Sequence, residues 1–230
     1  MQMMDQLALF TGYDLAALIL LFVLWLGIGW RIEHPSVRHP STSMLVARYR
    51  RDWMREMVTR QPRIFDAQIL ATLRQGTAFF ASTCVIALGG TLALIGNPDR
   101  VAGLAEDITR TGDAELIWEI KLMIPAFFLT TGFLKFVWSN RLFGYCSVMM
   151  AAVPNDIENE KAYHRAEQAA EINITAAKSF NRGLRAIYFA LAAAAWLIGT
   201  TALVAATLIT FFVIWRREFA SHSRKILLND

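Results

Sequence analysis

The sequence predicts an all-α polytopic membrane protein with four or five transmembrane helices and two amphipathic helical segments on the cytoplasmic side. Of its 230 residues, 55% are hydrophobic and only 18% are charged, and the mean hydropathy is +0.37. Apolar runs long enough for a bilayer recur along the chain. Basic residues concentrate in two of the segments between these runs. This composition excludes a disordered chain and disfavours a soluble domain.

Apolar runs with few or no charges define the spans. The first begins after Asp14, and its acidic flank excludes a secretory signal, which needs a basic start. The second is uncharged and rich in small residues, which favour close packing of helices in lipid. The third has Trp118 and Trp138 at its two ends, where interfacial aromatic residues belong. The fourth, 186–215, is longer than one crossing needs and shorter than two crossings with a turn usually take.

Charge decides the orientation and the number of crossings. Residues 31–74 contain nine Arg against four acids, 97–116 contain two Arg against five acids, and 139–185 contain six basic residues. The positive-inside rule then places the first and third of these segments in the cytoplasm and the amino terminus outside. The basic tail after Trp215 favours two short helices that break near Gly199, with a cytoplasmic carboxyl terminus; one long tilted helix is the alternative. With the break, spans are expected at about 11–30, 76–96, 117–138, 186–198 and 201–215.

Two segments are expected to leave the membrane as helices, at about 41–74 and 155–180. In the first, apolar residues share one helical face and arginines another, which is typical of an interfacial helix. Its arginines are expected to bind lipid phosphates, and nucleic acid is rejected as their partner because Arg clusters beside spans are topology and headgroup signals. The second segment opens with Asn155 as the expected helix cap. The headgroup candidates are Arg48, Arg51 and Arg55.

The third span carries ionisable side chains. Lys121 and Lys135 are fourteen residues apart, so they share one face with Pro125. An ionisable group on a spanning helix is a functional-site candidate. One interpretation is an anion path with the lysines at its mouths, hydroxyls of Thr130 and Thr131 midway and a carbonyl exposed by Pro125. The alternative is that both lysines snorkel to the headgroups.

A stripe on the second soluble segment offers oxygen and nitrogen atoms to a divalent metal. The stripe consists of Glu160, His164, Glu167 and Glu171, and its alternative interpretation is a solvated acidic face. No metal and no cofactor are assigned on this signal. The sequence contains no hydrolase, phosphate-loop or dinucleotide motif, and no histidine lies in a span, so neither an enzyme nor a membrane haem is expected.

Short motifs along the chain resemble a known family. They are DWMREM at 52–57, FFAST at 79–83, WEIKL at 118–122, FLKFVW at 133–138, YCSV at 145–148, FNRGLRAIYF at 180–189 and RREF at 216–219. Together, over about residues 15–220, they resemble the bacterial and plant membrane proteins catalogued as the domain of unknown function numbered five hundred and ninety-nine. The resemblance implies a multi-pass helical membrane protein and implies no activity, substrate or catalytic residue.

Two functions remain open. The leading hypothesis is a homo-oligomeric pore or transport protein of the bacterial inner membrane, with anions as the candidate substrate and the third span lining the path. It rests on the ionisable face of that span and on the small residues that favour self-association. The alternative is a non-conducting accessory or scaffolding subunit of a larger membrane complex, which binds anionic lipid through its Arg-rich helix.

Overall fold

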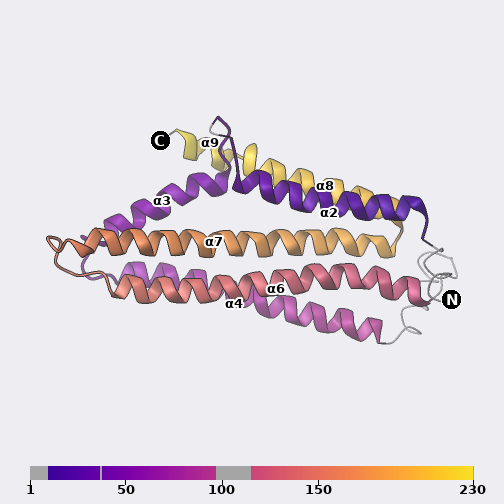
Figure 1. Ribbon diagram of the computed structural model, residues 1–230, viewed down its shortest axis with the longest axis horizontal. Coiled ribbons are helices and arrows are strands. Elements are labelled where there is room, and N and C mark those ends of the chain that lie inside the picture. The colour runs from indigo at the N-terminus through magenta and orange to yellow at the C-terminus, as the bar shows by residue number, and fades with distance from the viewer. Residues whose placement is uncertain (1–9, 37, 97–114, 230) are drawn as a thin grey trace. The chain divides into compact units, whose positions relative to one another are not determined.

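The computed structural model describes residues 10–36, 38–96 and 115–229, and every regular element in them is a helix (Figure 1). The expected all-α class is therefore confirmed. The helices are α2 (Gly12–Glu33), α3 (Thr42–Met57), α4 (Ile64–Ile95), α6 (Glu115–Ala151), α7 (Lys161–Ala194), the short 3₁₀ helix η1 (Ala195–Leu197), α8 (Thr200–Phe219) and α9 (His222–Leu228).

The described residues form two compact units, and several helices contribute to both. Unit 1 lies within Met1–Arg31, Thr83–Gly132 and Leu184–Arg216, and unit 2 lies within Ile32–Ser82, Phe133–Gly183 and Arg217–Asp230.

Three helices of the described chain are long and apolar enough to cross a membrane. They are Gly12–Glu33, Ile64–Ile95 and Ile117–Ala151. In α4 only 6% of the apolar stretch is buried within the protein, and Phe79 and Ile86 are 63% and 76% exposed. Such an apolar surface is stable against lipid hydrocarbon, not against water. The chain therefore has the helices of a membrane protein.

The long run from 186 to 215 is divided between two helices in unit 1. The chain leaves η1 and turns at Gly199, whose φ of +154° favours glycine, before α8 begins at Thr200. Asp14 holds this turn, because its Oδ1 accepts the indole N–H of Trp196 at 3.1 Å and the hydroxyl of Thr200. The turn lies where the sequence favoured a break.

The helix expected at about 155–180 begins later, at Lys161, and the predicted cap at Asn155 is wrong. Asp156 Oδ1 accepts the N–H of Glu158 at 3.0 Å, and Asn159 Oδ1 accepts the N–H of Lys161 at 3.0 Å. These short polar side chains stabilise turns in place of a helix. Asn159 therefore supplies the side-chain oxygen at the start of α7, which then continues without interruption to Ala194.

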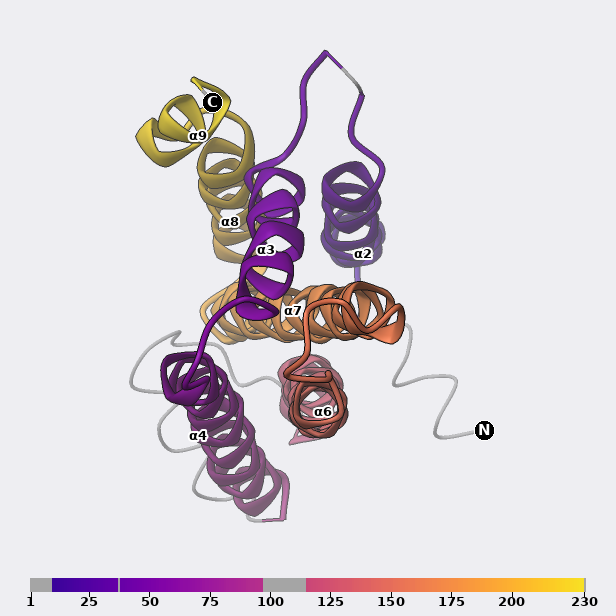
Figure 2. The same cartoon turned by 90° about the vertical axis from the view of Figure 1, so that its left-hand side faces the viewer.

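The core of unit 2 is formed by α3, α4, α6 and α7. Its large members include Met54, Met57 and Phe143, which are at most 2% exposed. Facing them is a row of buried alanines on α7, whose small side chains let neighbouring helices approach closely. Three stacked or edge-on rings, Phe80, Phe136 and Phe180, have centroids 5.4–5.6 Å apart. The short helix α9 lies beside α3 (Figure 2).

Unit 1 has a core of aromatic side chains from α2, α6 and α7. Phe128 is fully buried and lies at its centre. The ring centroid of Phe128 is 5.0 Å from that of Trp25, 5.5 Å from that of Phe22 and 6.2 Å from that of Phe189. Offset and edge-on ring pairs of this kind contribute about 0.5–1.5 kcal/mol each beyond the area they bury.

Candidate functional site

Helix α3 carries the arginines that the sequence assigned to lipid headgroups. It is capped by Ser41, whose Oγ accepts the N–H of Met44 at 3.3 Å and donates to the carbonyl oxygen of Ile32 at 2.9 Å. The apolar face of the helix, with Leu45 and Met54, is buried. Its exposed arginine face consists of Arg48, Arg51 and Arg55.

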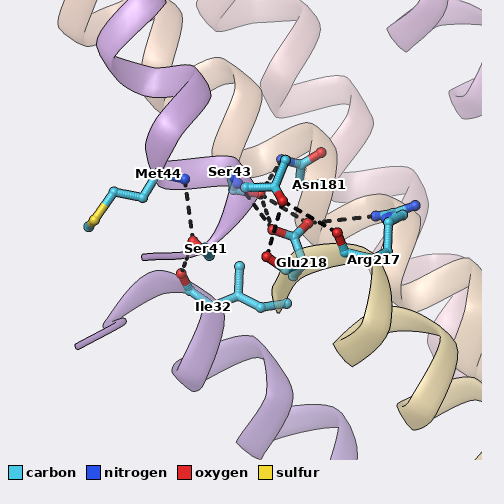
Figure 3. Close-up of polar contacts among 8 residues, drawn as sticks. Ile32, Ser41, Ser43, Met44, Asn181, Arg217 and Glu218 are labelled. Carbon is cyan, nitrogen blue, oxygen red and sulfur yellow. Dashed lines mark hydrogen bonds and ion pairs between the residues drawn. The ribbon is translucent and has the colours of Figure 1, made fainter. Parts of the chain in front are cut away.

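A buried carboxylate holds the first turn of α3 (Figure 3). Glu218, which is 5% exposed, accepts the N–H of Ser43 at 3.1 Å through Oε2 and the hydroxyl of Ser43 at 3.0–3.1 Å. The hydroxyl of Thr42 donates to the carbonyl oxygen of Glu218 at 3.0 Å. The first N–H groups of a helix have no partner within the helix, and its dipole favours a negative charge there. Glu218 therefore fixes the start of the arginine helix to the end of α8.

A short stretch of α7 ties three other elements of unit 2 together. Asn181 Nδ2 donates to Ser43 Oγ at 3.4 Å, and Arg182 Nε donates to Glu33 Oε1 at 2.9 Å. The hydrogen bond to Glu33 raises the pKa of Arg182. A Cβ atom on Gly183 would lie 2.8 Å from the ring of Phe136, so only glycine fits this crossing of α7 and α6. The motif at 180–189 thus has a packing role that the sequence did not reveal.

The middle of α3 meets α7 through two arginines. The guanidinium of Arg50 donates to Asn173 Oδ1, and burial lowers the pKa of Arg50. Asn173 is a neutral amide and is fully buried, so the contact leaves the charge of Arg50 uncompensated. Arg51 Nε lies 2.6 Å from Glu171 Oε1, but both side chains are more than half exposed. A pair so exposed contributes at most about 1 kcal/mol.

The end of α3 is fastened to the start of α4 by another buried carboxylate. Asp66 is fully buried, and its Oδ1 accepts the indole N–H of Trp53 at 2.7 Å and a hydrogen bond from the guanidinium of Arg60. Asp66 Oδ2 has no hydrogen-bond partner in the part of the chain that the structure describes. The sequence signal for this residue is an acid in the first turn of a helix.

The stripe that offered candidate ligands for a divalent metal is not gathered into a cluster. Glu160 precedes α7, whereas His164, Glu167 and Glu171 lie exposed on it. Glu167 and Glu171 line a cavity of about 370 Å³ that also contains the basic side chains of Arg51 and Arg55. Guanidinium groups compete with a cation for these carboxylates. Across residues 10–36, 38–96 and 115–229, no group of three or more potential ligands is placed to hold a metal ion.

The predicted path residues of α6 fall in both units. In unit 1, the ammonium of Lys121 lies 4.8 Å from the ring centroid of Trp118, a cation–π contact, and Thr130 Oγ1 donates within its own helix to Ala126 O at 2.9 Å. Pro125 is buried and Thr131 is partly buried. In unit 2, Lys135 is partly buried, and its carbonyl oxygen accepts the hydroxyl of Ser179 at 2.9 Å.

Comparison with known proteins places these features in a family. A family model described as "Protein of unknown function, DUF599" matches residues 16–223. No curated protein and no solved structure matches the chain. The family match covers most of the sequence and confirms the resemblance found in the short motifs.

Proposed function

Because this chain belongs to the DUF599 family of proteins of unknown function, we propose a function from its own geometry. The protein is a non-conducting accessory or scaffolding subunit of a larger membrane complex, and it binds anionic lipid headgroups through the arginine face of α3. In this proposal it lies in the bacterial inner membrane with five crossings. Its amino terminus is outside, and α3 and the carboxyl terminus are in the cytoplasm.

The proposal rests on two arginines whose side chains are exposed and form no ion pair with the described residues, on a helix that is held at both ends. Arg48 and Arg55 are exposed, and neither forms an ion pair with any described residue. Their helix is held at one end by Glu218 and at the other by Asp66. A guanidinium group donates two parallel hydrogen bonds to a phosphate, and a rigid support lowers the entropy lost on binding.

The position of α3 in the chain supports the same partner. Eight residues separate α2 from α3, and six separate α3 from α4. Both neighbours are among the helices able to cross a membrane. Short connections to two spans keep the arginines near the membrane surface, where anionic headgroups attract each of them with about 1 kcal/mol.

We expect the double variant Arg48→Gln/Arg55→Gln to lose most of its preference for anionic lipid. Two lost arginines correspond to about 2 kcal/mol, or roughly a tenfold to thirtyfold fall in the preference for phosphatidylglycerol over phosphatidylcholine. Native mass spectrometry of protein released from mixed-lipid nanodiscs measures how much phosphatidylglycerol and how much phosphatidylcholine stay bound. The matched control is Lys161→Gln/Lys178→Gln, which removes two exposed charges from α7. Equal losses in both double variants would contradict the proposal.

A homo-oligomeric pore is the second candidate, and one observation favours it. The ammonium of Lys135, on a helix able to span the membrane, has no hydrogen-bond or ionic partner among the described residues. A charge in such a position is costly and is typical of substrate and ion pathways.

For a pore, replacing Lys121 and Lys135 with Met is expected to abolish anion flux into proteoliposomes. The control Lys178→Met changes an exposed lysine of α7 and leaves flux at the wild-type level. Reversal potentials that follow the chloride equilibrium identify an anion path. Flux that persists in the double Met variant rules out Lys121 and Lys135 as path residues. If the wild type shows no flux and co-purifies with foreign subunits, the accessory function is favoured.

A further inference from the structure

Unit 2 contains a groove between the start of α4 and the end of α6. Its volume is about 450 Å³, within the range of about 300–1,000 Å³ that is typical of small-molecule sites. Its lining includes Arg63, Leu70 and Arg74 on one side and Met150 on the other, with Met57 from the end of α3. None of the lining residues is an Asp or a Glu, so the groove has a positive charge.

Arg63 is a fixed positive charge at one end of the groove. Its terminal nitrogens donate to the carbonyl oxygens of Val153 at 2.6 Å, Pro154 at 2.8 Å and Val58 at 3.3 Å. Carbonyl groups are neutral, so these bonds position the guanidinium without cancelling its charge. Its Nε is buried and has no hydrogen-bond partner in the described ranges.

Arg74 presents free hydrogen-bond donors at the other end. Its Nε donates to Asn140 Oδ1 at 3.3 Å. Its two terminal nitrogens form no hydrogen bond or ion pair with the described residues, and the side chain is exposed. This planar pair of N–H groups matches two oxygens of a phosphate. Arg74 is also the last charged residue of α4 before an uncharged stretch to Ile95, so it lies where headgroups begin.

The walls between the two arginines are mostly apolar, and the hydroxyl of Ser147 in the lining donates to the carbonyl oxygen of Phe143 at 3.0 Å. Met57, Leu70 and Met150 are at most 7% exposed, and the small side chains of Ala67 and Ala71 leave room beside them. A bare phosphate would satisfy the arginines and leave these walls uncovered. A ligand with an apolar part attached to an anionic group would contact the arginines and also cover the apolar walls, which removes that apolar surface from water.

We propose that this groove binds an anionic amphiphile, with a phosphate group on Arg74 and an apolar part against Met57, Leu70 and Met150. The ligand comes from the membrane leaflet as a lipid or from the aqueous side as an alkyl phosphate. The site goes beyond the lipid contact proposed for α3, because its residues are different from Arg48 and Arg55. Each proposal can therefore be contradicted by experiment while the other stands.

The test is a titration of the full-length protein in mild non-ionic detergent with four compounds. They are inorganic phosphate, hexyl phosphate, dihexanoyl phosphatidylglycerol and, as the zwitterionic control, dihexanoyl phosphatidylcholine. We expect at least one anionic amphiphile to bind at least about tenfold more tightly than both inorganic phosphate and the zwitterionic lipid. Tighter binding of phosphatidylglycerol identifies the leaflet as the source, and tighter binding of hexyl phosphate identifies the aqueous side.

Two variants separate the contributions of charge and apolar surface. Arg74→Gln is expected to weaken the anionic amphiphile about tenfold or more, and Ala71→Trp, which fills the groove, to weaken it while sparing inorganic phosphate. The matched control is Lys178→Gln, which removes one exposed positive charge from α7, outside the groove. Unfolding temperatures check that each variant is folded, and Arg74→Lys, which keeps the charge, is expected to retain part of the affinity. Equal binding of phosphate and amphiphile, or equal losses in Arg74→Gln and Lys178→Gln, would overturn the proposal.

Discussion

Replacing Asp66 with Ala is expected to lower the free energy of unfolding by about 3 kcal/mol. The substitution removes the carboxylate oxygen that accepts hydrogen bonds from both Trp53 and Arg60. The partly buried indole N–H and guanidinium then lose this acceptor. For a chain of this length, such a loss lowers the unfolding temperature by roughly 6–12 °C. Tryptophan fluorescence during thermal unfolding in detergent measures the change.

The control for this experiment is Asp52→Ala. Asp52 belongs to the same region but is exposed, so its replacement is expected to change stability by no more than about 0.5 kcal/mol. Equal unfolding temperatures for the two variants would show that the hydrogen bonds of Asp66 contribute nothing to the joint between α3 and α4.

The variant Glu218→Gln is expected to free the first turn of α3 and to cost about 2 kcal/mol. An amide keeps one acceptor oxygen but places an NH₂ group against Ser43, whose N–H and hydroxyl both donate to the native carboxylate. Hydrogen exchange followed by mass spectrometry is expected to show faster exchange at residues 43–46, because local opening becomes easier.

Glu56→Gln is the matched control, since Glu56 lies exposed on α3. It makes the same chemical change without touching the start of the helix, and exchange at 43–46 is expected to match the wild type. If Glu218→Gln also leaves that exchange unchanged, the carboxylate does not hold the arginine helix.

Local patterns were sufficient to predict much of the fold. Uninterrupted apolar runs identified the three helices of the described chain that are able to span a membrane, whereas the spans expected at 186–198 and 201–215 stay predictions. The separation of Arg from apolar residues identified α3. The position of Gly199 in an over-long run indicated the turn before α8. The cap of α7 was misplaced, because Asn155 and Asn159 both precede a helical pattern and only the hydrogen bond to Lys161 distinguishes them.

The contacts that build the candidate sites were beyond the reach of such patterns. Glu218 and Ser43 are 175 residues apart, and neither has a local feature that points to the other. Arg74 looks like any basic residue beside a span until α6 is placed against α4. Periodicity predicts the face on which a side chain lies, whereas the partner of that face depends on tertiary packing.

The anchoring of α3 by Glu218 has a consequence during protein synthesis. The carboxylate acceptor of Ser43 is synthesised 175 residues after Ser43 itself. At about 5–20 residues per second, the ribosome needs roughly 9–35 s to cover that distance. The first turn of α3 therefore gains its native partner only after Glu218 has been synthesised, and a chain terminated before Glu218 lacks the carboxylate that stabilises this turn.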